Sequence, residues 1–365
     1  MKIGFIIERN VYFRTFGPVI EEAIKKGHQV FCLHNYSQPR GGSKGYQFPD
    51  ISQTPKFKNG QVIPLDYKTE DDLIKKVLES NIQAVVSLDF FAIYLLTRNR
   101  LKEKGVFWVA LQSGFDSLAA CSEFLKCPDK FFIFSRNGFW VTDQAALPSR
   151  SVIKKELGIP EDKKVVLLFP FPFGSSKKTF WTRYIYGTRF FSKENDFEVT
   201  KAIKEFCLKN NGFLLVKSRK KEPTKRYLSK VADKILFDEE FYPSTTLKCF
   251  AIADIFFSFY STGVMESAIM GVSNVCISPD EKDWVDLQNP LFKAISEEKK
   301  LFHWPGVSYK QTVMEIIKNL PQKKISDFPF NKQEQIKYLQ KFANGKVENI
   351  AENIVLEIEK MIKKE

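Results

Sequence analysis

Short apolar runs alternate with segments of helical periodicity along almost the whole chain, and this alternation constrains the fold more than any other feature. In the first half, the apolar runs Lys2–Ile7, Gln29–Leu33 and Ala84–Leu88 are separated by helical segments such as Phe16–Lys26. Apolar runs of this length are typical of buried parallel strands, and a helix between two of them provides the crossover connection. The sequence therefore predicts an α/β fold with parallel sheets covered by helices on both faces.

The other expected elements follow the same pattern. In the first half they are helices at Glu70–Ser80, Phe90–Lys104 and Ser117–Phe124, strands at Val106–Gln112 and Lys130–Phe134, and a surface loop at Tyr36–Gly60. In the second half they are strands at Val165–Phe169, Phe213–Val216, Ile235–Phe237 and Asn274–Ile277, and helices at Val152–Leu157, Glu198–Asn210, Thr224–Val231, Thr245–Ile252 and Gln333–Lys364.

A linker around Asp143–Arg150 divides this alternation into two halves. The 365 residues of the chain are enough for two domains of ordinary size. We therefore expect one Rossmann-like domain over residues 1–145 and a second over residues 151–335, followed by a C-terminal helix over residues 336–365.

The composition is that of a soluble globular protein, with 44% hydrophobic and 27% charged residues. No apolar run approaches the roughly 20 residues that span a bilayer, and Glu8 and Arg9 come too early for a secretory signal. The six cysteines are scattered singly, without a CxxC pair. These features favour a cytoplasmic protein with reduced thiols and without a metal site.

The formal net charge of +13 comes mainly from lysines that are spread over the expected helices. Three explanations stay open: a solvated lysine-rich surface, attraction to an anionic membrane surface as a peripheral protein, and binding of nucleic acid. The sequence contains none of the common nucleic-acid-binding motifs, so we expect no nucleic-acid partner.

The most specific motif lies between Ala251 and Ser278, where an apolar strand is followed by a tight turn and a helix. The turn contains Ser261, Thr262 and Gly263, and Glu266 follows one turn into the helix. Backbone N–H groups at a helix start attract anions, hydroxyls add donors, and glycine lets a ligand come close. The motif predicts a diphosphate site. The alternative is an ordinary strand–turn–helix with Ser261 as the N-cap.

This segment resembles the donor-binding segment of the GT-B glycosyltransferases and of their relative, the UDP-N-acetylglucosamine 2-epimerase. The entry to the second half, VIKKELGIPEDKKVVLLFPF, resembles that of CDP-glycerol glycerophosphotransferases. The resemblance implies two Rossmann-like domains facing a central cleft, with the C-terminal helix crossing back to the first domain. It also implies that Ser261, Thr262 and Gly263 bind the diphosphate and Glu266 the ribose of a nucleotide sugar, which is the substrate, with no separate cofactor.

Other candidate donor-binding residues follow strands of the second half, where open parallel sheets bind ligands. Lys217 and Arg219 follow one strand, and their cationic groups are suited to a phosphate. Gly174 and Ser175 follow another strand and could present N–H groups to the phosphates. The alternatives are a solvated basic turn and a plain Gly-Ser surface loop.

Tyr242 and Ser244 lie in the region where, by the resemblance, GT-B enzymes hold the nucleotide base. An aromatic face suits a base, although Tyr242 is equally suited to a protein core.

Carboxylates follow three strands of the first half, at Glu8, Asp89 and Asp116. An inverting sugar transferase needs a general base that takes the proton of the acceptor hydroxyl. Asp116 is the first candidate because it lies in a loop that contains glycine. Asp89 and Glu8 are the second and third candidates. The alternative for Asp116 is a helix N-cap, because Ser-Leu-Ala comes directly after it.

The sequence thus predicts a metal-independent glycosyltransferase of surface polysaccharide or glycolipid synthesis, with a carbohydrate or lipid-linked acceptor. Two other enzymatic functions stay open by resemblance, a polyol-phosphate transferase and a UDP-sugar 2-epimerase. The non-enzymatic alternative is a scaffold that binds a nucleotide sugar without turnover.

Overall fold

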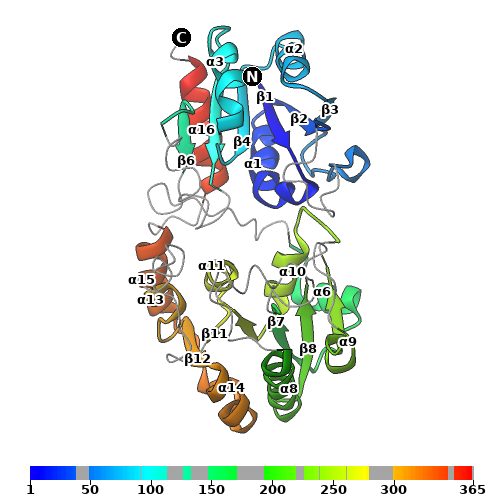
Figure 1. Cartoon of the computed structure of the whole chain (residues 1–365), viewed down its shortest axis with the longest axis vertical. Coiled ribbons are helices and arrows are strands. Elements are labelled where there is room, and N and C mark those ends of the chain that lie inside the picture. The colour runs from blue at the N-terminus through cyan, green and yellow to red at the C-terminus, as the bar shows by residue number, and fades with distance from the viewer. Residues whose placement is uncertain are drawn as a thin grey trace. The chain divides into compact units, whose positions relative to one another are not determined.

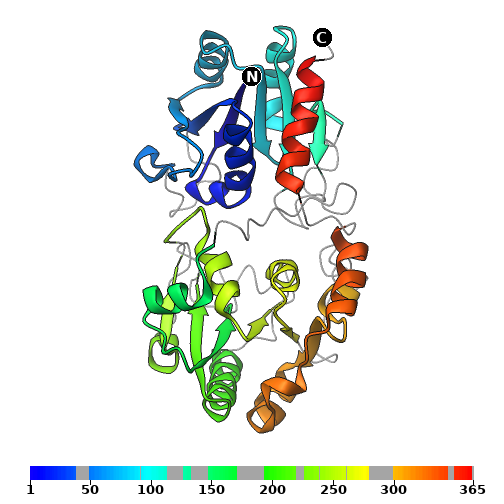
Figure 2. The ribbon, with the colours of Figure 1, turned by 180° about the vertical axis from the view of Figure 1, so that it is seen from behind.

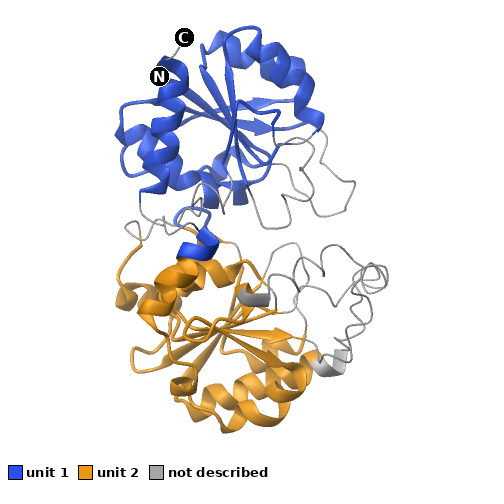
Figure 3. Ribbon diagram, turned by 90° about the vertical axis from the view of Figure 1, so that its left-hand side faces the viewer, with its two compact units in different colours: residues 1–143, 240–243, 340–365 blue, residues 144–239, 244–339 orange. Residues whose placement is uncertain are grey.

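The computed structural model describes residues 1–37, 49–90, 92–112, 126–132, 147–170, 193–218, 226–237, 239–259, 261–278, 299–343 and 349–363. The chain divides into two compact units, which are coloured separately in Figure 3. Unit 1 comprises residues 1–143, 240–243 and 340–365, and unit 2 comprises residues 144–239 and 244–339.

Unit 1 is built on a six-stranded parallel sheet in the order β3-β2-β1-β4-β5-β6. The strands are β1 (Lys2–Ile7), β2 (Gln29–Asn35), β3 (Ile63–Tyr67), β4 (Ala84–Leu88), β5 (Phe107–Leu111) and β6 (Lys130–Phe132), labelled in Figure 1. The helices are α1 (Phe13–Lys25), α2 (Glu70–Glu79), α3 (Leu95–Lys102) and α16 (Ile350–Lys363), and the short 3-10 helices are η1 (Asn10–Tyr12), η2 (Ile51–Gln53) and η3 (Ala92–Tyr94).

Both faces of the first sheet are covered, as its apolar strands require. Side chains alternate along a strand, so that Ile6 and Val85 point into a core formed with α2 and α3, where Leu73 and Leu101 are buried. Helices α1 and α16 contact each other, and α16 also contacts β5. Figure 2 shows these two helices together in front of the strands.

The C-terminal helix α16 belongs to unit 1, which confirms the predicted return of the chain end to the first domain. Its apolar side, with Ile354, Val355 and Ile358, is buried. The polar side carries Glu359, whose carboxylate lies 2.7 Å from the Nε2 atom of His28, which follows α1. Apolar burial and this polar contact together fix α16 on the first sheet.

Unit 2 repeats the architecture with the strand order β12-β11-β10-β7-β8-β9, also fully parallel. The strands are β7 (Lys164–Leu168), β8 (Gly212–Lys217), β9 (Lys234–Leu236), β10 (Ile255–Ser258), β11 (Asn274–Ser278) and β12 (Ser308–Thr312). The helices are α6 (Arg150–Leu157), α8 (Lys193–Lys209), α9 (Leu228–Val231), α10 (Thr245–Ile252), α11 (Gly263–Ile269), α13 (Lys299–Phe302), α14 (Val313–Asn319) and α15 (Lys332–Ala343), with 3-10 helices η8 (Leu320–Gln322) and η9 (Ile325–Asp327).

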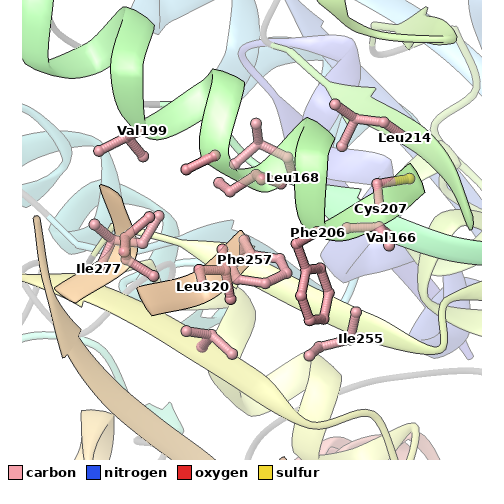
Figure 4. Close-up of a cluster of buried hydrophobic side chains, with 14 of the residues drawn as sticks. Val166, Leu168, Val199, Phe206, Cys207, Leu214, Ile255, Phe257, Ile277 and Leu320 are labelled. Atoms are coloured by element: carbon pink, nitrogen blue, oxygen red, sulfur yellow. The ribbon is translucent and has the colours of Figure 1, made fainter. Parts of the chain in front are cut away.

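The second sheet separates two hydrophobic cores. Val166 and Phe257 point to the side of α8 and α14, where Phe206 packs edge-on against Phe257 at 5.6 Å (Figure 4). Leu167 and Phe256 point to the opposite side, toward α6 and α10. The predicted α/β fold with Rossmann-like domains is confirmed by these two sheets.

The structure differs from the sequence prediction at the sheet edges β3 and β12 and at the chain end, where the expected single helix Gln333–Lys364 is α15 followed by α16. The sequence pattern does not predict strands β3 and β12, nor helix α14. The expected single helix Phe90–Lys104 is instead η3 followed by the shorter α3. Edge strands contact a neighbour on one side only, so they need not consist of apolar residues and give a weaker signal.

No helix within the described part of the chain is both long and apolar enough to span a bilayer.

Candidate active site

The strand order of each sheet fixes where a ligand would bind. Each first strand lies in the middle of its sheet, so the chain turns in opposite directions on its two sides, between β1 and β4 in unit 1 and between β7 and β10 in unit 2. In open α/β sheets a crevice forms at this point, beyond the carboxyl ends of the two strands. Glu8 and Asp89 follow β1 and β4, and Ser261 lies three residues beyond β10.

Glu8 is held by two tyrosine hydroxyl groups. The hydroxyl of Tyr12, in η1, donates a hydrogen bond of 3.1 Å to Oε2, and that of Tyr94, in η3, donates to Oε1. Glu8 itself is half-buried. A carboxylate that is oriented in this way and still partly exposed has the geometry of a general base.

Asp89 has a backbone conformation that is uncommon for a residue with a side chain, with φ at +58°. Its carbonyl oxygen accepts a hydrogen bond of 2.7 Å from the hydroxyl of Ser87, and its N–H donates to the carbonyl of Leu111 at 2.7 Å. The residue is 4% exposed. These two hydrogen bonds stabilise the left-handed backbone of Asp89.

Glu8 and Asp89 are each the first residue beyond the carboxyl end of a strand, and the two strands, β1 and β4, are neighbours in the sheet. Both acidic residues therefore follow the strands between which the chain changes direction.

The polar groups of the turn after β10 bond within the turn, much as the N-cap alternative for Ser261 anticipates, although the N-cap residue of α11 is Thr262. The Ser261 hydroxyl accepts a hydrogen bond of 3.2 Å from the N–H of Gly263, and the carbonyls of Ser261 and Thr262 accept from the next two N–H groups. The backbone donors at the start of α11 are thus already engaged. A phosphate here would rely on the hydroxyls of Ser261 and Thr262 more than on backbone N–H groups.

The structure gives a different reason for glycine at position 263 from the close ligand approach that was expected. A Cβ atom at this position would lie 3.1 Å from Phe169 Cε2 and 3.3 Å from Phe256 Cζ. Both rings belong to the packing of unit 2 on the side of α10. The absent side chain lets α11 begin directly against these rings, and a Cβ atom here would push them by a few tenths of an ångström, so packing favours glycine whether or not a ligand approaches.

Glu266 and Lys217 are both buried, at 6% exposure each. Glu266 lies in the first turn of α11, where the helix dipole favours a carboxylate. Lys217 is the last residue of β8, which is separated from β10 only by β7. Two strand spacings amount to about 10 Å, which a lysine side chain and a diphosphate together can bridge.

Ser244 and Tyr242 have structural roles. Ser244 is the N-cap of α10, and its hydroxyl accepts a hydrogen bond of 3.2 Å from the N–H of Leu247. Tyr242 lies in unit 1, stacked on Phe57 with 5.4 Å between ring centroids, and its ring fills the space that a Cβ atom of Gly17 would need. The expectation that Tyr242 lies in the second domain is wrong, and packing accounts for its ring.

Four candidates, Asp116, Arg219, Gly174 and Ser175, lie outside the described residues. Within the described residues, no group of three or more His, Cys, Asp and Glu side chains could hold a metal ion.

Tyr12 and Tyr94 were missed by the sequence reasoning. Tyr94 stands in the apolar stretch LDFFAIY, where an aromatic residue predicts core packing, and nothing in its spacing reveals the bond to Glu8. Tyr12 is the fourth residue after Glu8. This spacing would have suggested a contact between the two side chains only if helix η1 had been predicted.

Neither a protein-family model nor a curated protein matches this chain. Solved structures, in contrast, match the fold of this chain. The wall teichoic acid polymerase TagF is 13% identical with a TM-score of 0.59, over 100% of this chain and 89% of that one. A putative UDP-N-acetylglucosamine 2-epimerase from Listeria monocytogenes is 11% identical with a TM-score of 0.56, over 100% and 97%.

The glycosyltransferase VinC, solved in complex with dTDP, is 9% identical with a TM-score of 0.52, and each chain is covered completely. At such identities the likeness shows the fold and not the activity. The chain therefore has the GT-B fold that its sequence resemblance implied, over its whole length.

Proposed function

We propose that this protein is a metal-independent glycosyltransferase that transfers a sugar from a nucleoside-diphosphate donor to a hydroxyl acceptor. The observation that carries the proposal is the set of polar residues that follow the two central strands of each sheet. Unit 1 has two carboxylates beyond adjacent strands, Glu8 and Asp89, and unit 2 has the hydroxyl pair of Ser261 and Thr262 beyond β10. The proposal is supported by two structures with this fold, a glycosyltransferase bound to dTDP and an epimerase named for a UDP-sugar.

In the proposed donor site, the hydroxyls of Ser261 and Thr262 donate to the diphosphate and Lys217 supplies a positive charge. At about 4 Å, one such charge contributes on the order of 4 kcal/mol before desolvation, at an effective dielectric constant near 20. Glu266 accepts from the ribose hydroxyls. These groups stabilise the leaving diphosphate in the place of a metal ion. We include Arg219, Gly174 and Ser175 as candidates for the same anion.

In the proposed acceptor site, Glu8 takes the proton of the acceptor hydroxyl. The acceptor oxygen then forms a bond to the anomeric carbon while the bond between that carbon and the diphosphate oxygen breaks. The nucleoside diphosphate leaves with the electron pair, and the proton stays on the carboxyl of Glu8. Asp89 and Asp116 are the alternative bases.

The test is a thermal-shift screen of nucleoside diphosphates and nucleotide sugars. We expect at least one of them to raise the melting temperature at millimolar concentration. Ser261→Ala is expected to weaken that nucleotide about tenfold, because it removes a hydrogen bond to a charged group. Glu266→Gln should weaken nucleotide sugars while leaving inorganic pyrophosphate unaffected.

Ser273→Ala is the matched control. Ser273 is a buried serine of the same unit, one residue before β11, and its hydroxyl has no hydrogen-bond partner within the described part of the chain. If no nucleotide stabilises the protein, or if the control weakens binding as much as Ser261→Ala does, the assignment is wrong.

The likeness to an epimerase and to a teichoic acid polymerase supports two other reactions, 2-epimerisation of a UDP-sugar and polyol-phosphate transfer. Product analysis with UDP-N-acetylglucosamine separates them, because an epimerase converts the donor without an acceptor. A nucleotide-sugar-binding scaffold would bind the donor without consuming it. We propose a carbohydrate or lipid-linked acceptor in surface polysaccharide or glycolipid synthesis. The proposed location is the cytoplasm, with peripheral membrane association through the positive charge.

A further inference from the structure

We propose that Tyr94, assisted by Tyr12, is a positioning residue that orients the Glu8 carboxylate for proton transfer. The inference rests on the proposed function, because it assigns a role to the neighbours of the proposed base. It adds two residues that neither the sequence nor the comparisons single out.

The two hydrogen bonds act on different oxygens of Glu8. Tyr94 donates to Oε1, and Tyr12 donates to Oε2 at 3.1 Å. The last torsion angle of a glutamate side chain has a broad energy minimum, so a carboxylate held at one oxygen can still rotate. Donors on both oxygens select one plane for the group. They occupy about two of the four acceptor positions that a carboxylate offers.

Tyr94 is itself held firmly. It is 5% exposed, and its ring lies 5.2 Å from that of Trp108 and 5.9 Å from that of Phe90. The indole N–H of Trp108 donates to the Ser87 hydroxyl at 2.9 Å. That hydroxyl in turn donates to the carbonyl oxygen of Asp89. One aromatic stack therefore supports both acidic residues of the crevice, Glu8 through Tyr94 and Asp89 through Trp108.

Tyr12 is less constrained. It is half-buried, and its ring makes an edge contact with Phe16 at 6.1 Å. We therefore assign the larger share of the positioning to Tyr94. The structure suggests Tyr94→Phe as the sharpest variant, because it keeps the stacked ring and removes only the donor.

In steady-state kinetics, Tyr94→Phe is expected to lower kcat about tenfold and to leave the KM for the donor unchanged. Tyr12→Phe should lower kcat to a smaller extent. A merely structural role would lower the melting temperature without a loss of kcat at unchanged KM.

Tyr309→Phe is the matched control, because it also removes a hydroxyl hydrogen bond from an aromatic ring that stays in place. The Tyr309 hydroxyl donates to the carbonyl oxygen of Pro329 at 2.6 Å, in unit 2. We expect its kcat to equal that of the wild type. Equal losses of kcat in the Tyr94 and Tyr309 variants, or an unchanged kcat in Tyr94→Phe, would overturn the proposal.

A crystal structure of Tyr94→Phe tests the inference without any activity. We expect the Glu8 carboxylate to rotate or to occupy two orientations, while the substituted ring and the Trp108 ring keep their wild-type positions. A single, wild-type orientation of Glu8 would refute the positioning role. If the wild-type protein transfers no sugar from any donor, the proposed function fails, and this structure still decides whether Tyr94 orients Glu8.

Discussion

Three aspartates, Asp129, Asp233 and Asp254, each stand one residue before a strand and bind the neighbouring strand. Their carboxylates accept hydrogen bonds of 2.7–2.8 Å from the N–H groups of Trp108, Leu214 and Val165, respectively. Each carboxylate is also paired with a basic side chain. The sequence does not reveal these hydrogen bonds, because an Asp before an apolar run is also what a plain turn contains.

We predict that Asp254→Ala lowers the free energy of unfolding by about 2–3 kcal/mol, since it leaves the N–H of Val165 and the Arg150 guanidinium without this acceptor. Urea unfolding measures the change. Asp162→Ala, on an exposed turn, serves as the control and should stay within about 0.5 kcal/mol of the wild type. Equal stability of the two variants would contradict the assignment.

The burial of His34 leads us to expect that the stability of the protein depends on pH. Its Nδ1 lies 2.9 Å from the carbonyl of Cys32 and its Nε2 3.2 Å from the hydroxyl of Thr54, and the ring is fully buried. Burial lowers the pKa of the imidazole from its ordinary value of 6.5. Between the lowered and the ordinary pKa, the unfolded chain binds a proton that the folded protein does not, so stability falls as the pH drops below about 6.5.

The measurement is urea unfolding at pH 7.5 and pH 5.5 for the wild type and His34→Gln. The wild type should lose stability between the two values, and the variant should lose less. A variant that shows the full wild-type pH dependence would exclude His34 as its source.

At the scale of elements, apolar periodicity located the strands of both sheet centres and the edge strands β6 and β9, but not the edge strands β3 and β12. Strand β10, IFFS, is buried throughout, so hydrophobicity alone reveals it. Strand β12, SYKQT, has one buried and four half-buried residues and no apolar pattern, and only its pairing with β11 makes it a strand. Tertiary pairing, which the local sequence does not encode, decides such elements.

The polar groups of the candidate sites were predictable as residues that follow strands, and their local bonds were not. Ser261 was singled out for its place after β10, yet the structure shows its hydroxyl bound to the N–H of Gly263. Glu8 was singled out in the same way. Its partner Tyr12 comes from helix η1, which was not predicted, and its partner Tyr94 comes from η3, which lies within the expected helix Phe90–Lys104.

Helix α16 gives a prediction at the same scale. Val355 is fully buried in unit 1, and Val355→Asp places a charge where it has no water. We expect the variant to release α16, seen as rapid proteolysis after residue 343, and to lower the melting temperature by several degrees. Asn353→Asp introduces the same charge at an exposed position of the helix and should leave both unchanged.

At the scale of the whole molecule, each unit has its own sheet with covered faces and its own cores. We therefore predict two transitions in calorimetry. Phe257→Ala, at a fully buried position of unit 2, should lower one transition, because it removes a large side chain from that core.

A donor nucleotide should raise the same transition that Phe257→Ala lowers, since its proposed site lies in unit 2. Trp108→Phe, a buried substitution in unit 1, provides the comparison and should lower the other transition. If the nucleotide raises only the transition that Trp108→Phe lowers, the donor binds unit 1 and the division of roles is reversed.

The repeated strand order allows the two halves to be compared position by position. After the first strand, unit 1 has Glu8 where unit 2 has Phe169, and after the fourth strand it has Asp89 where unit 2 has Phe259. Two acids in one half thus stand where phenyl rings stand in the other. We expect the acidic pair of unit 1 to repel a diphosphate and the phenyl pair of unit 2 to impose no such repulsion, so that of two sheets with the same strand order only the second would accept the proposed donor.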